Sequence, residues 1–122
     1  MIKMVYCITR RDDTDAEDFY RYWLEEHGPL VKSVARQLNA VRYVQSHTIL
    51  PAINEMLQNS REGLQGPYDG ITEVWWNSQE ELEAALQTTA GQEATARLAE
   101  DEARFADFSR CRVFMTREHE IF

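Results

Sequence analysis

Three side chains that can donate, accept or relay a proton alternate along AVRYVQSHTIL, residues 40–50: Tyr43, Gln45 and His47. The segment is rich in β-branched and aromatic residues and predicts a strand. Alternate side chains of a strand share one face at a spacing of about 7 Å. A phenol, an amide and an imidazole in such a row can hydrogen-bond a polar ligand and transfer a proton. A solvated strand face is the alternative, and the spacing alone leaves both interpretations open.

A further titratable ring, His27, stands in YWLEEHGPLV, where Gly28 and Pro29 interrupt an amphipathic helical pattern. Its spacing from Phe19 and Trp23 puts His27 on the apolar stripe and predicts an inward direction. Pro29 lacks an N–H, so the helix is expected to bend or restart there. A partly buried imidazole at this break can act as a general acid or base, or can cap its own helix end.

Glu73 and Trp75 share one face of another predicted strand, residues 70–77. If this face coincides with that of Tyr43, they add a carboxylate and an aromatic wall to a mostly apolar pocket. Tyr6, on the first predicted strand, is the second expected wall. A structural ion pair between Glu73 and a base such as Arg42 is the alternative.

Other reactive groups lack the spacing that their chemistry needs. His27, His47 and His119 show no metal-ligand spacing, so no metal site is predicted. Cys7 and Cys111 form no C-x-x-C pair, and without an export signal they are expected to be reduced thiols in the cytoplasm. The cluster AEDEARFAD, residues 99–107, predicts the solvated face of a helix.

The elements that must position these residues follow the order β-α-β-β-α-β, which is the ferredoxin-like α+β pattern. Capping boxes begin helices at Thr14 and Ser78. Strands are expected at about 2–9, 40–50, 70–77 and 111–122. Helices are expected over about 15–38 with a break at 28–29, over 52–58, from 78 to a stop at Gly91, and over 92–108.

Both faces of the predicted sheet carry large apolar side chains. Met4 and Val5 alternate on the first strand, and the adjacent Trp75 and Trp76 must point to opposite faces. The helix-free face is therefore apolar and needs a cover. A second copy of the chain is the predicted cover, which gives a barrel-like homodimer.

Length and charge limit the class of protein. A chain of 122 residues suits one domain, residues 1–122. Its net charge of 13 − 21 = −8 argues against nucleic acid or anionic membranes as partners, because both select basic surfaces. No apolar segment is long enough to span a bilayer. A small-molecule substrate remains the expected partner besides the second copy.

The stretch FYRYWLEEHGPLV resembles the aromatic–W–x₃–H–x–P–L signature of the EthD family, within the dimeric α+β barrel superfamily. The resemblance extends over nearly the whole chain, through IKMVYCITRR, YVQSH, YDGITEVWW and DEARFADFSR in that order. It implies a ferredoxin-like protomer, a homodimer, and a pocket between the sheet and the helices.

The resemblance also implies a type of chemistry. Similar proteins include small cofactor-free enzymes, among them muconolactone methylisomerases and polyketide decarboxylases or dehydratases, and others associated with ether or aromatic breakdown without a defined reaction. In the isomerase-like members, the histidine of the H-x-P motif and a tyrosine and a histidine of the second strand lie at the pocket. These positions are His27, Tyr43 and His47 here. The pocket cysteine of the methylisomerases has no counterpart in ITEVWW.

The leading prediction is a cofactor-independent acid–base enzyme of the isomerase or lyase type. Its substrate is a small carbonyl-bearing aromatic, lactone or polyketide-like compound. His47 or His27 removes a proton beside the carbonyl, and Tyr43 donates to the developing enolate oxygen. Tyr6, Gln45, Glu73 and Trp75 are the expected substrate-binding residues. Isomerisation, dehydration and decarboxylation all pass through such an enolate and are not separated by the sequence.

Two other functions stay open. One is a non-catalytic protein that binds a hydrophobic ligand or supports an oxidative degradation system. The other is a haem-handling barrel, which a histidine on an inner face keeps possible.

Overall fold

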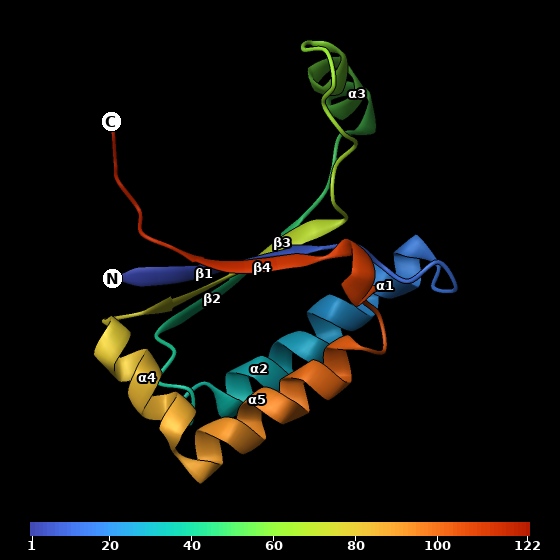
Figure 1. The fold of residues 1–122 in the computed structure, drawn as a ribbon. Coiled ribbons are helices and arrows are strands. Elements are labelled where there is room, and N and C mark those ends of the chain that lie inside the picture. Colours follow the sequence, from blue (N-terminus) through green and yellow to red (C-terminus); the bar gives the residue numbers. More distant parts are fainter.

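A four-stranded antiparallel sheet in the order β2-β3-β1-β4 organises residues 1–122 in the computed structural model (Figure 1). The helices α1, α2, α4 and α5 lie on one side of this sheet, and α3 stands on the other (Figure 1). This arrangement confirms the predicted ferredoxin-like α+β fold. The strands are Ile2–Ile8 (β1), Arg42–His47 (β2), Gly70–Trp76 (β3) and Arg112–Thr116 (β4). The helices are Ala16–Tyr22 (α1), Trp23–His27 (η1), Gly28–Val34 (α2), Pro51–Asn59 (α3), Gln79–Gln87 (α4), Thr89–Glu102 (α5) and Phe108–Arg110 (η2).

The strand register decides which side chains share a face. Tyr43 lies opposite Val74, which in turn lies opposite Met4, so these three occupy the helix-covered face. Trp75 and Trp76 point to opposite faces, as predicted. The indole N–H of Trp76 donates to the backbone carbonyl of Leu38, below the sheet, at 2.7 Å.

Before Gly28 and Pro29, where a bend or a restart was predicted, the helix passes through a π-helical turn. α1, η1 and α2 follow one another without a gap, and the N–H of Gly28 donates to the carbonyl of Trp23. This wider turn accommodates Pro29, which has no N–H to donate. The predicted second helical piece is α2, which begins at Gly28 and has Pro29 in its first turn. The capping alternative for His27 is wrong, because its side chain caps neither helical piece.

Three predicted boundaries also differ from the structure. The break before α5 lies at Thr88, whose side chain accepts the N–H of Gly91 at 2.9 Å, so Gly91 belongs to the first turn of α5. A local N-cap has replaced the expected glycine stop. α5 ends at Glu102 instead of continuing to residue 108. β4 ends at Thr116, and the residues after it leave the sheet.

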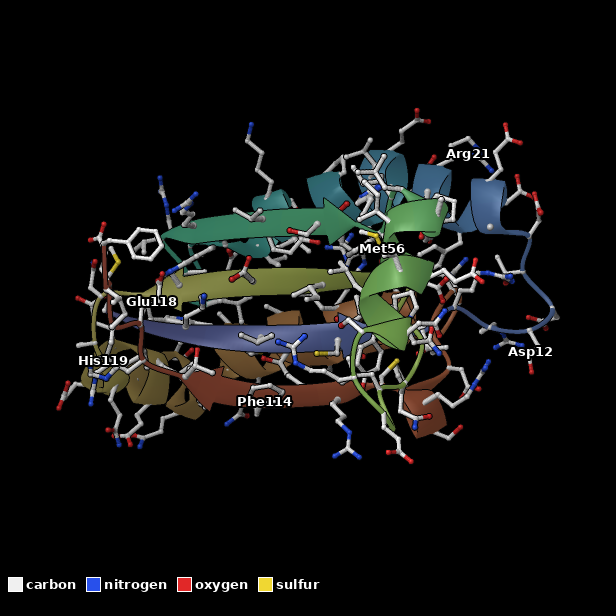
Figure 2. All side chains as sticks on the ribbon, turned by 90° about the horizontal axis from the view of Figure 1, so that it is seen from above. Asp12, Arg21, Met56, Phe114, Glu118 and His119 are labelled. Carbon is white, nitrogen blue, oxygen red and sulfur yellow. The ribbon has the colours of Figure 1, made fainter.

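The core lies at one end of the molecule, where α1 and the end of α5 meet β1. Its most deeply buried side chains are Phe19, Trp23 and Phe105, which pack against Ile8. Seen from the helix-free side, α3 with Met56 stands over one end of the sheet, and β4 with Phe114 runs along an edge (Figure 2). None of the helices is both long and apolar enough to span a membrane.

Candidate functional site

The row Tyr43, Gln45 and His47 lies on the helix-covered face of β2 and is joined by hydrogen bonds. The Gln45 amide N–H donates to the Tyr43 hydroxyl oxygen at 2.8 Å. The Gln45 amide oxygen lies 2.9 Å from Nε2 of His47. Because β2 is an edge strand, this row follows one border of the sheet. The predicted row of phenol, amide and imidazole is therefore a connected chain.

The π-helical turn fixes the direction of this chain. The second N–H of the Gln45 amide donates to the backbone carbonyl of Trp23 at 2.8 Å. With both N–H groups used, the amide oxygen must face His47, which requires the proton of His47 to sit on Nε2. Nδ1 of His47 then carries the lone pair, and no hydrogen bond engages it.

Two aromatic rings stack against the imidazole of His47. The Trp23 ring stacks on it at 4.5 Å between centroids, and the Tyr20 ring at 5.2 Å. Gly70 makes room for this stack, because a Cβ there would lie 2.5 Å from the Trp23 ring. Burial lowers the pKa of His47, so the ring is neutral at neutral pH. A neutral imidazole with a free Nδ1 can accept a proton.

The hydroxyl of Tyr43 complements that base. Burial raises its pKa, while hydrogen bonds from Gln45 and Thr72 act in the opposite direction. The oxygen accepts the Gln45 N–H, and no protein acceptor receives the hydroxyl hydrogen. The Tyr43 hydroxyl is therefore free to donate to the oxygen atom of a ligand.

A groove of about 460 Å³ opens between β2 and the helical segment η1–α2. Tyr43 and Gln45 line its inner wall, and Leu24 and Val31 contribute apolar surface. Its only charged lining residues are Lys32 and Arg42, both basic, in a chain whose net charge is −8. The groove thus combines apolar walls with a few polar groups, as small-molecule sites usually do.

His27 lies outside this row, on the side of the helix that faces α5. Its side chain is buried, and Nδ1 is 2.7 Å from Oδ2 of Asp101. The hydroxyl of Tyr22 donates to the other oxygen of Asp101 at 2.5 Å. Burial lowers the pKa of His27, and the Asp101 carboxylate acts in the opposite direction. His27 therefore belongs to a second polar cluster.

Glu102 extends this second cluster toward the sheet. Its carboxylate lies 3.9 Å from Nε2 of His27. Burial raises the pKa of Glu102 to about 7, and a hydrogen bond from Tyr6 acts in the opposite direction. Burial, followed by the charge of Glu102, raises the pKa of Tyr6. This cluster can hold or release a proton near neutral pH.

The sequence did not lead us to predict Asp101 and Glu102 as site residues, because the pattern of their segment predicts the solvated face of a helix. Both are largely buried, with side chains 15% and 19% exposed. The available signal was their spacing from Leu98 and Phe105, which puts them on the apolar stripe of the helix. Two carboxylates on an apolar stripe indicate buried partners.

Glu73 and Trp75 do not join either cluster, which corrects the predicted common pocket. The register places both on the helix-free face, opposite to Tyr43. Glu73 forms an ion pair with Lys3 at 2.7 Å. Arg42 lies over the Trp75 ring at 4.5 Å. Adjacent strands of a sheet share faces according to register, and the sequence does not reveal the register.

The seven predicted site residues thus fall into three places. Tyr43, Gln45 and His47 lie together, with the first two at the groove. His27 and Tyr6 meet through Glu102, and Glu73 and Trp75 lie across the sheet. No group of three or more His, Cys, Asp or Glu side chains is placed to hold a metal ion.

The chain resembles known proteins both in sequence and in structure. The family described as EthD domain matches residues 11–109. No match was found among curated proteins. An ethyl tert-butyl ether D (EthD) family protein from Bacillus halodurans has a similar structure, with a TM-score of 0.63, 14% identity, and 98% of this chain and 99% of that chain covered.

Two further solved structures share the fold. A dimeric protein of unknown function and ferredoxin-like fold from Bacteroides fragilis has a TM-score of 0.58, 7% identity, and coverage of 94% of this chain and 93% of that chain. SnoaB, a cofactor-independent oxygenase from Streptomyces nogalater, has a TM-score of 0.53, 12% identity, and coverage of 98% and 93%. At these identities the likeness concerns the fold alone.

Proposed function

The chain belongs to the EthD family, and we propose that it is a cofactor-independent acid–base enzyme acting on a small carbonyl compound. The substrate class is an aromatic, lactone or polyketide-like molecule with an acidic hydrogen beside its carbonyl. The enzyme is of the isomerase or lyase type. The apolar groove beside Tyr43 and Gln45 is the proposed binding site, and its basic rim suits a substrate with an anionic group.

One observation carries this proposal: Gln45 links an imidazole with a free lone pair to a phenol with a free hydrogen. In the proposed reaction, the substrate extends from the groove past Gln45 to His47, which does not line the groove. Nδ1 of His47 then takes the proton beside the substrate carbonyl. The electron pair of the broken C–H bond moves onto the carbonyl oxygen, which becomes an enolate. The Tyr43 hydroxyl donates a hydrogen bond to that oxygen. Return of the proton to a different carbon completes an isomerisation, and expulsion of a β-hydroxyl, which leaves as water with that proton, completes a dehydration. In a decarboxylation the same enolate forms instead by loss of carbon dioxide from a β-keto acid, and its carbon then takes a proton from water.

The second cluster has a supporting role in this proposal. Asp101 holds the imidazole of His27 in one orientation, and Glu102 is the group that holds a proton near neutral pH. Tyr6 lies beside Glu102 and belongs to this second cluster, outside the lining of the groove. That SnoaB is described as an oxygenase without a cofactor supports small-molecule chemistry of this kind on the fold.

The proposal includes the organisation of the molecule. Residues 1–122 form a single domain, and two copies pair through their helix-free sheet faces into a homodimer. The dimeric protein of similar fold from Bacteroides fragilis supports a homodimer. A cytoplasmic location stays a prediction from the cysteine content.

Enolate formation is testable before the natural substrate is known. The protein is incubated in D₂O with a panel of lactones, phenolic ketones and short polyketide analogues, and proton NMR follows loss of the hydrogen beside each carbonyl. Wild-type protein is expected to speed deuterium exchange in at least one compound. His47→Ala is expected to abolish this exchange, because it removes the base.

Tyr43→Phe tests the proposed hydrogen-bond donor separately from the proposed base, His47. It keeps the ring and removes the hydroxyl, so exchange is expected to slow by about 10²-fold or more, as when one enolate-stabilising donor is lost. His119→Ala, a change in the exposed C-terminal segment, is the matched control and leaves exchange unaltered. Undiminished exchange in both His47→Ala and Tyr43→Phe contradicts the proposal.

A binding protein without catalysis is the second candidate, because the groove is lined by Tyr43 and Gln45 but not by His47. In that case the groove shelters an apolar ligand, and Gln45 orients it. Ligands from the panel then bind, as seen by changes in tryptophan fluorescence, without any deuterium exchange.

A further inference from the structure

The segment between β2 and β3, residues 49–67, forms an arm that leaves the body of the molecule. It contains α3 and rises from the helix-free side of the sheet (Figure 1). No residue of α3 is buried. Its apolar side chains Ile53, Met56 and Leu57 are 46%, 63% and 54% exposed. Large apolar side chains gathered on one exposed helix mark a contact surface.

The base of the arm is fixed firmly to the sheet. The N–H of Thr48 donates to the carbonyl of Asp69 at 3.1 Å, and the Thr48 hydroxyl donates to the carbonyl of Tyr68 at 2.6 Å. The N–H of Asp69 donates to the carbonyl of Ile8 at 2.8 Å. These bonds close the two ends of the arm and set where it emerges.

The start of the arm has a left-handed backbone conformation that is held by local contacts. Leu50, just before α3, has φ of 60° and ψ of 63°, the left-handed region that disfavours a residue with a Cβ. Such a conformation persists only where surrounding contacts determine it. Within the chain, the carbonyl of Leu50 accepts the N–H of Asn54 at 3.0 Å, and the carbonyl of Ile49 accepts the side-chain amide of Asn54 at 2.7 Å.

We propose that the arm is a clasp that packs across a second copy of this chain, with Ile53, Met56 and Leu57 against the partner. This inference rests on the proposed homodimer and adds an element to it. The arm lies on the same side as the sheet face that the homodimer covers. Met56 on the arm and Phe114 on β4, 63% and 49% exposed, both lie on this side of the molecule (Figure 2).

The charge distribution favours a second copy over other occupants. The arm carries only Glu55, Arg61 and Glu62 as charged residues, so its net charge is 1 − 2 = −1, and the rest of the chain carries −8 − (−1) = −7. Two acidic chains repel least where their charge is lowest. One arginine is too little basic charge for an anionic membrane surface.

Photo-crosslinking of the full chain tests this contact directly. p-Benzoylphenylalanine is incorporated at position 56 on the arm, or at position 86 on α4, where the native leucine is 47% exposed. Irradiation at a protein concentration above the dimer dissociation constant is expected to give a covalent dimer from position 56 only. A covalent dimer is intermolecular, so a contact within one chain does not produce it.

Analytical ultracentrifugation then tests whether the clasp contributes to the stability of the homodimer. Leu57→Glu is expected to raise the dimer dissociation constant by about 30-fold or more, as loss of a buried interface anchor does. Leu86→Glu adds the same charge on α4 and leaves the constant unchanged. Circular dichroism spectra verify that both variants are folded.

The outcomes distinguish the clasp from the function proposed above. The clasp is refuted if the wild-type chain dimerises, Leu57→Glu leaves its dimer dissociation constant unchanged, and position 56 gives no crosslink. This result would still be compatible with a dimer paired through the sheet faces. A wild-type chain that stays monomeric at all concentrations overturns both. Deuterium exchange by a monomer still supports the enzyme.

Discussion

The orientation of one amide, Gln45, decides which nitrogen of His47 is available for chemistry. Its N–H groups are engaged by Tyr43 and by the Trp23 carbonyl, so its oxygen faces Nε2 of His47. If the amide turned over, Nε2 would face an N–H donor and the proton of His47 would move to Nδ1. Gln45 is thus a positioning residue for the proposed base.

The unusual pKa of Glu102 gives a prediction at the same scale. Burial raises the pKa from 4.5 to about 7, so folding binds a proton between these values. Stability from this group is fully present below pH 4.5 and is lost as the pH rises through 7. Glu102→Gln stays neutral. Its free energy of unfolding, relative to wild type, is therefore expected to rise by about 2 kcal/mol between pH 5 and pH 8.

Urea denaturation of both proteins at several pH values measures this difference. Subtracting one curve from the other cancels the titration of His27 and Asp101 as long as their environments are shared. Glu100→Gln changes an exposed carboxylate two residues away and is the control. Parallel stability curves for wild type and Glu102→Gln would show that Glu102 ionises normally.

At the scale of elements, the π-helical turn and the strand beside it form one unit. The turn presents the Trp23 carbonyl to Gln45, and the Trp23 ring lies over Gly70 and stacks on His47. Helix and sheet are therefore joined through Trp23, which has no exposed surface. Movement of this indole would disturb both the amide and the imidazole.

Gly70→Ala tests this packing. The new Cβ would lie 2.5 Å from the Trp23 ring and 2.7 Å from the Ser46 carbonyl oxygen, so one of them must shift. A loss of unfolding free energy of about 1–3 kcal/mol is expected, as for other overpacked sites. Denaturant unfolding followed by tryptophan fluorescence measures it. Gly66→Ala, whose Cβ meets nothing closer than 3.7 Å, is expected to be neutral.

At the scale of the whole molecule, the two sheet faces differ in what covers them. Helices cover one face, and the other carries Val5, Val44 and Phe114 together with the Lys3–Glu73 ion pair. A pairing of two such faces buries apolar surface but brings together two chains of charge −8 each. The neutral pair of Lys3 and Glu73 adds no net charge at that face.

Substitutions at two neighbouring residues of β4 test which face of the sheet forms the dimer interface. Phe114, 49% exposed, lies on the helix-free face, and Val113, 56% exposed, lies on the other. Phe114→Glu is expected to raise the dimer dissociation constant at least about tenfold, equivalent to 1.4 kcal/mol. Val113→Glu should leave it unchanged. Analytical ultracentrifugation measures both, and equal effects of the two changes would refute pairing through the helix-free face.

Local patterns in the sequence were enough to predict much of the fold. The alternation in AVRYVQSHTIL placed Tyr43, Gln45 and His47 in one row, because the period of a strand is two. The order of strands and helices predicted the ferredoxin-like fold, and FYRYWLEEHGPLV indicated the EthD family. These features depend on residues that are close in sequence, so they can be predicted from the sequence alone.

Contacts between distant segments were decided only by the tertiary structure. Glu73 lies across the sheet from Tyr43 because of strand register, and Asp101 meets His27 because α5 packs against the π-helical turn. The sequence determined which groups can hold a proton and on which elements they lie. The fold decided which of them meet, because burial and pairing depend on segments that are far apart along the chain.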